Sequence, residues 1–158
     1  VTGVQTCALP IFEGGRCLDL FAGSGGLGIE AISRGMDELY SVDKQYRAFA
    51  TIQHNIKTLG IENQVHVYKL DYSKALLKLA QEQVSFHLVL LDPPYQMKIH
   101  QKILDFLVEH HMLCDQCIIV IEDLKEEAID VKEPFVLKKQ QNYGITSLQI
   151  LVYKEKKS

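Results

Sequence analysis

The segment LDLFAGSGGLG, residues 18–28, begins in a short apolar run and ends in a glycine-rich loop. The apolar run extends from Arg16 to Phe21, and apolar residues recur at helical spacing from Leu27 to Arg34, where Gly35 ends the pattern. A buried strand, a glycine loop and a helix are therefore predicted in this order. Glycines let the backbone turn tightly and approach a ligand closely, so the loop is also a candidate binding site.

The rest of the chain continues to alternate strands with helices. Further short strands are expected at Leu39 to Val42, Val65 to Leu70, Phe86 to Leu91 and Cys117 to Ile121. Helices are expected from Tyr46 up to Gly60, from a cap at Ser73 through Ala80, and from about Lys98 to His111. This alternation predicts an α/β fold with a mostly parallel sheet and helices on both faces.

The end of the chain has a different pattern. Phe135 to Lys138 and Thr146 to Tyr153 are strand-like runs, and Gln140 to Gly144 between them supplies turn residues. We therefore expect an antiparallel hairpin here, in place of another strand and helix.

Length and composition indicate one domain. The chain has 158 residues, of which 47% are hydrophobic, enough for a single core of ordinary size. No apolar run approaches the ~20 residues that cross a bilayer, and no secretory signal is visible, so a cytoplasmic location is expected. The net charge of −3 argues mildly against a large polyanionic partner, unless basic residues are clustered.

The cysteines do not indicate disulfides or a metal site. Reduced thiols are expected because Cys7, Cys17, Cys114 and Cys117 lack a framework-like spacing. Cys114 and Cys117 form a C-x-x-C pair near two histidines, but Cys117 is expected to point from a buried strand. We predict no metal ligand in the chain.

Acidic residues lie at or just after the ends of four predicted strands. In parallel sheets, ligands bind beyond the carboxyl ends of the strands, near the point where the strand order reverses. The acids at these ends are Asp19, Asp43, Asp71 and Asp92. Asp43 is placed to accept hydrogen bonds from a ribose diol, and Asp71 from an adenine amino group. One shared site is therefore expected.

The pattern of residues at this site is compatible with two cofactors. Gly23 to Gly28 matches G-x-G-x-x-G and Asp43 lies 20 residues after Gly23, a fingerprint that taken alone favours NAD. S-adenosylmethionine carries a positively charged sulfonium and no phosphate. Asp19 suits that cation and would repel a pyrophosphate, so the charge favours S-adenosylmethionine. The cofactor-binding residues are predicted to be Asp19, Phe21, Ala22, Gly23, Ser24, Gly25, Asp43, Lys44, Asp71, Tyr72 and Asp92.

The sequence Asp92-Pro93-Pro94-Tyr95 is the candidate catalytic segment. An exocyclic amine of a base is a poor nucleophile, because its lone pair is delocalised into the ring. Asp92 and the carbonyl of Pro93 can each accept a hydrogen bond from the amine, which then becomes more tetrahedral. The prolines fix the backbone, and Tyr95 offers a face on which a flipped-out base can stack.

These motifs resemble the RsmD family of bacterial methyltransferases. The resemblance runs from about Phe12 to Tyr153 and rests on residues 18–35, on Asp92 to Tyr95, and on Gly144-Ile145-Thr146 in the closing hairpin. It implies a Rossmann-like class I methyltransferase fold of seven strands with S-adenosylmethionine as the methyl donor. It also implies methylation of the N2 amine of one guanine in 16S ribosomal RNA, within the 30S subunit or an assembly intermediate.

The beginning of the chain departs from that family. Members open with a basic hairpin and a helix, which close over the methionine end of the cofactor and touch RNA. Here residues 1–11 read VTGVQTCALPI, which is similar to a translated sequencing adapter. We therefore expect residues 1–11 to be a non-native segment and residues 12–158 to form a methyltransferase domain without the basic hairpin, with weakened cofactor and RNA binding.

Other functions remain open from the residues alone. Asp-Pro-Pro-Tyr also occurs in methyltransferases that act on the N6 amine of adenine in DNA, and a protein glutamine methyltransferase is a further alternative. A fourth interpretation, besides the RNA, DNA and protein methyltransferases, is a non-catalytic nucleotide-binding module. A monomer is expected.

Overall fold

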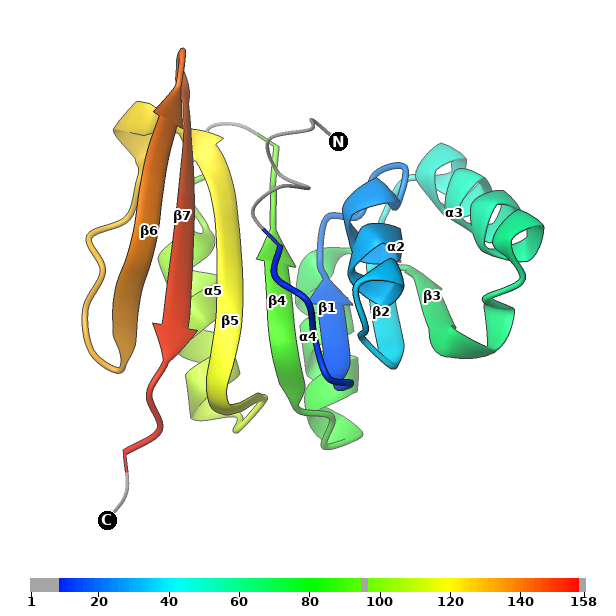
Figure 1. Ribbon diagram of the computed structural model, residues 1–158, viewed down its shortest axis with the longest axis horizontal. Helices are drawn as coiled ribbons and strands as arrows, with labels where there is room; N and C mark the ends of the chain where they lie inside the picture. Colours follow the sequence, from blue (N-terminus) through cyan, green and yellow to red (C-terminus); the bar gives the residue numbers. More distant parts are fainter. Residues whose placement is uncertain (1–8, 95–96, 157–158) are drawn as a thin grey trace.

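The computed structural model describes residues 9–94 and 97–156 of the chain (Figure 1). Most of the segment predicted to be non-native, residues 1–8, lies outside these described residues. Leu9, from the same segment, is 3% exposed, and its carbonyl accepts a hydrogen bond from Arg34 Nη1 at 3.0 Å. The prediction that residues 1–11 are non-native stays a prediction.

The described strands form one seven-stranded sheet in the order β3-β2-β1-β4-β5-β7-β6. Neighbours from β3 to β5 pair in parallel, whereas β7 is antiparallel to both β5 and β6. The predicted α/β fold with a mostly parallel sheet and a closing hairpin is confirmed. The strands are β1 (Arg16–Asp19), β2 (Glu38–Asp43), β3 (Val65–Lys69), β4 (Phe86–Leu91), β5 (Leu113–Leu124), β6 (Phe135–Tyr143) and β7 (Thr146–Tyr153).

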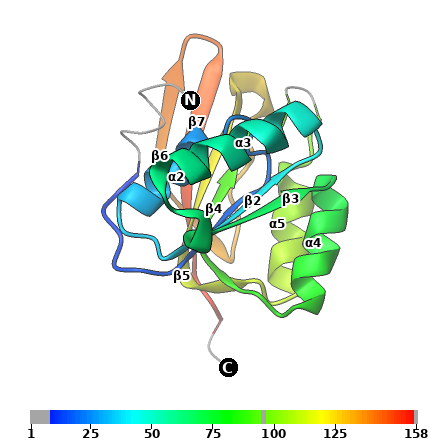
Figure 2. The same ribbon diagram turned by 90° about the vertical axis from the view of Figure 1, so that its right-hand side faces the viewer.

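Helices cover both faces of the sheet, as Figures 1 and 2 show. The apolar residues of α2 (Gly26–Ser33) and α3 (Tyr46–Leu59) pack into one core and those of α4 (Tyr72–Gln81) and α5 (His100–Glu109) into the other. β4 supplies both cores, because Leu88 and Leu90 face α2 and α3 while Val89 and Leu91 face α4 and α5. Its unbroken apolar run is thus explained by burial on both sides. Turns of 3₁₀ helix lie at Glu62–Gln64 and Lys125–Glu127. No helix in the described ranges is long and apolar enough to cross a membrane.

Several element boundaries differ from the sequence prediction by a few residues, and the differences in α4, β5 and β6 have a visible physical reason. The helix expected to be capped by Ser73 begins at Tyr72, because the Asp71 side chain accepts a hydrogen bond from Ser73 N and caps it. β5 starts at Leu113 and ends at Leu124 because pairing with β4 and β7 extends it beyond its apolar centre. β6 continues to Tyr143, so the hairpin turn lies at residues 144–145 rather than at 140–144.

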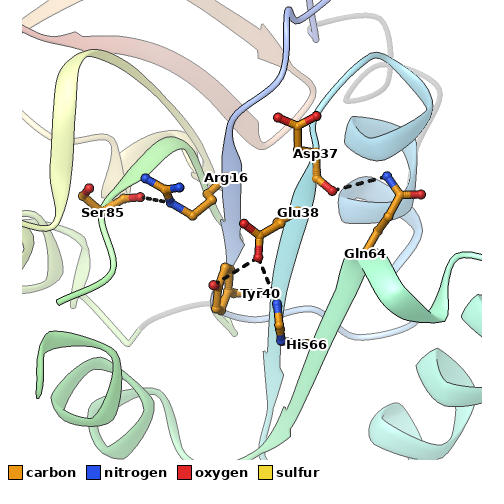
Figure 3. A network of polar contacts seen from close by, with 7 residues as sticks. All are labelled: Arg16, Asp37, Glu38, Tyr40, Gln64, His66 and Ser85. Carbon is orange, nitrogen blue, oxygen red and sulfur yellow. Dashed lines mark hydrogen bonds and ion pairs between the residues drawn. The ribbon is translucent and has the colours of Figure 1, made fainter. Parts of the chain in front are cut away.

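Polar contacts connect the amino ends of the strands, opposite the predicted site (Figure 3). Glu38 Oε2 lies 3.0 Å from His66 Nε2 and accepts a hydrogen bond from the Tyr40 hydroxyl at 3.3 Å. Arg16 Nε donates to the Ser85 carbonyl at 2.8 Å, and Gln64 Nε2 donates to the Asp37 carbonyl at 3.3 Å. These contacts join β1, β2, β3 and the residue before β4 at this end.

Gly35 permits a close approach between the end of α2 and the chain before β1. Its φ is +113°, and a Cβ there would lie 2.0 Å from the Phe12 carbonyl oxygen. Phe12 N donates to the Arg34 carbonyl at 2.7 Å, so the two backbones are held together at this point. A side chain at position 35 therefore has no space.

Gly35→Ala should lower the free energy of unfolding by at least ~3 kcal/mol, because backbone strain and a clash with backbone atoms add together. Gly60→Ala is the matched control, since Gly60 also has a positive φ, +70°, but nothing lies within 4 Å of a Cβ there. The control should cost only ~1 kcal/mol. Urea unfolding followed by circular dichroism measures both. Equal losses would show that crowding by Phe12 is unimportant.

Candidate functional site at the carboxyl ends of the strands

A cavity of about 480 Å³ opens at the carboxyl ends of the parallel strands. It lies around β1 and β4, between which the strand order reverses. The structure brings most of the predicted site residues together in its lining. These are Asp19, Phe21, Ala22, Gly23, Ser24, Asp43, Lys44, Asp71, Tyr72, Asp92, Pro93 and Pro94.

One described site residue of the prediction, Gly25, does not appear in this lining. Gly25 is the N-cap of α2, with a φ of +84°, and a Cβ there would lie 2.9 Å from Ile52. Gly25 therefore lets the loop turn into α2 while the backbone lies close to α3. Tyr95 lies outside the described residues. The lining also contains Gln45 and Leu70, which the prediction missed although each directly adjoins a predicted residue.

Asp19, at the end of β1, is the most deeply buried acid of the cavity, with 4% of its surface exposed. Burial, followed by the charges of Asp92 and Asp43, raises its pKa to about 7. Backbone N–H groups of Phe21 and Gly28 donate to it and oppose this rise. The charged form is costly because it is buried beside two other carboxylates, so a positively charged ligand in the cavity would stabilise it.

Asp43, at the end of β2, holds the glycine loop in place. Its Oδ2 accepts a hydrogen bond from Gly23 N and its Oδ1 one from Gln45 N, both at 2.9 Å. Ala22 N also donates to the Val42 carbonyl at 2.9 Å. Each carboxylate oxygen can accept a second hydrogen bond, so this structural role is compatible with the predicted contact to a ribose diol.

Asp71, after β3, both lines the cavity and caps α4. Its Oδ2 accepts hydrogen bonds from Ser73 N at 3.0 Å and from Ser73 Oγ at 2.5 Å. The bond from the Ser73 hydroxyl is the main cause that lowers the pKa of Asp71. This acid therefore stays ionised at neutral pH.

Asp92 lies between two other carboxylates along the sheet. It follows β4, whose neighbours are β1 and β5. Its charge raises the pKa of Asp19, and it also raises the pKa of Glu122 near the end of β5. Sequence reasoning missed Glu122, because the fifth strand was expected to end at Ile121. The signal was available: an acid directly follows that apolar run.

The charges in the cavity distinguish between the two cofactors. Its described lining contains four carboxylates and a single basic side chain, Lys44. A pyrophosphate would be repelled by this set, and the Gly23 amide already donates to Asp43. A sulfonium or ammonium group would relieve the repulsion between Asp19, Asp43 and Asp92. The residues thus fit S-adenosylmethionine, although the role of each residue in binding stays a prediction.

Comparison with known proteins finds one family over almost the whole chain. Residues 5–152 match the family described as conserved hypothetical protein 95. The putative rRNA methyltransferase YlbH of Bacillus subtilis is 38% identical over 148 residues, which cover 93% of this chain and 79% of that protein. Ribosomal RNA small subunit methyltransferase D of Haemophilus influenzae is 29% identical, covering 90% of this chain and 74% of the relative.

A solved structure has the same architecture. A conserved hypothetical protein from Streptococcus pyogenes superposes with a TM-score of 0.86 at 37% identity. The alignment covers 96% of this chain and 93% of that chain. The fold described above is thus shared by a protein of known structure.

Asp19→Asn should stabilise the cofactor-free protein at pH 8.5 but not at pH 4. The folded pKa of Asp19, about 7, lies above its unfolded value, so the cost of ionising it appears as the pH rises through this interval. Asparagine removes that cost, by at most ~4 kcal/mol above the folded pKa. Urea unfolding at both pH values measures the difference.

Asp71→Asn is the matched control for this experiment. Its pKa is lowered, so the folded state favours its charged form, and asparagine can still cap α4. The control should show no gain at pH 8.5. An Asp19→Asn effect that is the same at both pH values would contradict the assignment of a raised pKa.

Proposed function

The chain belongs to the family described as conserved hypothetical protein 95, the RsmD-type methyltransferases, and we propose that it methylates the N2 amine of a guanine in 16S ribosomal RNA. The methyl donor is S-adenosylmethionine. The substrate is the 30S subunit or an assembly intermediate of it. Two relatives whose names specify ribosomal RNA methyltransferases, from Bacillus subtilis and Haemophilus influenzae, support RNA as the acceptor.

The observation that carries this proposal is the position of Asp92. It lines the same cavity as Asp19 and Asp43, and the three charges interact closely enough to raise the pKa of Asp19. An acceptor held by Asp92 therefore lies beside whatever cation Asp19 binds. Methyl transfer requires this arrangement of donor and acceptor.

The donor side of the site consists of residues from β1, β2 and β3. When bound, S-adenosylmethionine supplies an electrophilic methyl group on a cationic sulfur. Asp19 would hold the positively charged end, Asp43 the ribose hydroxyls, and Asp71 the adenine amino group. Leu20 and Leu70 add apolar surface to the cavity, against which the adenine ring can pack.

The acceptor side consists of Asp92, Pro93 and the residues that follow. Asp92 accepts one hydrogen bond from the N2 amine and the Pro93 carbonyl accepts the other. The nitrogen lone pair would then turn out of conjugation with the ring and towards the donor. The new N–C bond would form as the S–C bond breaks, with the thioether as leaving group, and the amine would lose its proton to water late in the reaction. Positioning and charge stabilisation, rather than a covalent intermediate with the protein, account for this catalysis.

Asp92→Ala should reduce methyl transfer at least ~100-fold while most donor binding is retained, because the hold on the amine is lost whereas Asp19, Asp43 and Asp71 still line the donor side. Tritium transfer from labelled donor to 30S particles, naked rRNA, DNA and protein measures activity, and calorimetry measures donor binding. Asp130→Ala, at an exposed position, is the control and should keep full activity.

Each outcome of this assay assigns a function. Transfer to 30S particles or rRNA supports the proposal, whereas transfer confined to DNA identifies an adenine methyltransferase and transfer confined to protein a glutamine methyltransferase. Donor binding without transfer to any acceptor would indicate a non-catalytic module. Unchanged transfer by Asp92→Ala would remove Asp92 from the mechanism.

A further inference from the structure

Glu122 lies beside Asp92 on the strand that neighbours it. The parallel register pairs Leu90 with Val120 and Leu91 with Ile121, where β4 ends, and Asp92 and Glu122 are the residues that directly follow this last pair. Adjacent strands are ~4.8 Å apart. The charge of Asp92 acts on Glu122 as it acts on Asp19, which agrees with this proximity.

The side chain of Glu122 points to the same face of the sheet as the cavity acids. Val120 and Leu90, two residues earlier on their strands, both pack into the core under α2 and α3, and side chains on one face recur every second residue. Asp123 points to the opposite face, where its Oδ2 lies 2.6 Å from His100 Nε2. The strand order β1-β4-β5 thus places Asp19, Asp92 and Glu122 in a row.

Glu122 has an acceptor atom that nothing in the described chain uses. Its Oε2 is buried and has no hydrogen-bond partner among the described residues. A buried acceptor without a partner costs free energy, and Glu122 does not pair with a basic side chain in any described ion pair. Glu122 is also absent from the described lining of the donor cavity. The strand order places Glu122 on the far side of Asp92 from Asp19, and the residue as a whole is partly exposed, so its carboxylate can be reached from that side.

We propose that Glu122 selects guanine as the acceptor base by accepting a hydrogen bond from its ring N1–H, while Asp92 holds the adjacent N2 amine. This inference rests on the proposed function and names the residue that sets its base specificity. The row of acids would then divide at Asp92, with the donor on the Asp19 side and the acceptor base on the Glu122 side.

The chemistry of the bases supports this role. Guanine presents two neighbouring donors, N1–H and the N2 amine, and two carboxylates match them. Adenine and cytosine place an unprotonated ring nitrogen next to their exocyclic amine, so a carboxylate there would meet a lone pair. Such a mismatch leaves buried polar groups unpaired, which is the strongest basis for rejecting a wrong substrate.

The raised pKa of Glu122 is consistent with a carboxylate that accepts a hydrogen bond only when guanine is bound. Burial and then the charge of Asp92 raise its pKa to about 7. The N1–H donor would stabilise the carboxylate and lower this pKa on binding. The free protein thus holds a group that is costly to ionise, and guanine relieves that cost.

Glu122→Gln tests the proposal with 30S particles and 16S rRNA as acceptors, followed by digestion to nucleosides and mass spectrometry of the methylated products. The wild type should give N2-methylguanosine. The variant should form it at least ~10-fold more slowly, with donor affinity by calorimetry unchanged. Its amide N–H can donate to N1 of adenine, so the ratio of N6-methyladenosine to N2-methylguanosine should rise. A purely structural role would not move this ratio.

Two further variants complete the design. Glu122→Asp keeps the carboxylate and should retain guanine as the methylated base. It therefore tests the proposal even if the glutamine variant folds poorly. Glu126→Gln, at an exposed position four residues away, should behave as the wild type.

The outcomes separate failure of this inference from failure of the proposed function. If the wild type makes N2-methylguanosine and Glu122→Gln keeps both its rate and its product ratio, the function stands and the role of Glu122 is wrong. If Glu122→Gln loses donor binding instead, Glu122 belongs to the donor site and the inference is overturned. If the wild type methylates adenine, or no base at all, the proposed function itself fails.

Discussion

Mutual repulsion of carboxylates at one edge of the sheet is the constraint on which the site depends. Asp19 and Glu122 lie on β1 and β5, Asp92 directly follows β4 between them, and burial followed by the charge of Asp92 raises the pKa of both others. The fold tolerates this because apolar cores on both faces of the sheet supply the stability that the acids remove. Residues selected for stability alone would not gather here, since function commonly requires local groups that destabilise the free protein.

At the same end of the strands, backbone amides donate hydrogen bonds to one of the acids. Asp43 accepts hydrogen bonds from the backbone of Gly23 and Gln45, so the glycine loop is held by one of the acids that it accompanies. At the opposite end of the strands, polar side chains contact one another, as His66 Nε2 does with Glu38 Oε2 at 3.0 Å. There, His87 Nδ1 accepts from Arg16 N at 3.0 Å, and burial followed by the Arg16 charge lowers its pKa. The polar groups where the strands begin therefore contact one another, whereas the carboxylates where the strands end line a cavity.

The sequence predicted the fold and the members of the donor site because both follow from periodicity and strand ends. Asp19, Asp43, Asp71 and Asp92 could each be placed by the apolar run before them. Glu122 directly follows the apolar run that ends at Ile121, so the same rule could have placed it, but the extension of the strand to Leu124 by hydrogen bonds to β7 could not be predicted from composition. The second role of Asp71 was also missed, since Ser73 has equal propensity to cap and only the backbone decides between them. Burial of Asp19 depends on packing against α2, which no local pattern reveals.

The double role of Asp71 has a consequence for dynamics. One carboxylate oxygen secures the first turn of α4, while the same side chain lines the cavity. Occupancy of the adenine end would restrain this side chain and, through it, the backbone amides at the start of the helix. Hydrogen exchange at residues 72–75 should thus slow when the cavity fills, so that this helix end reports on ligand without touching the reacting atoms.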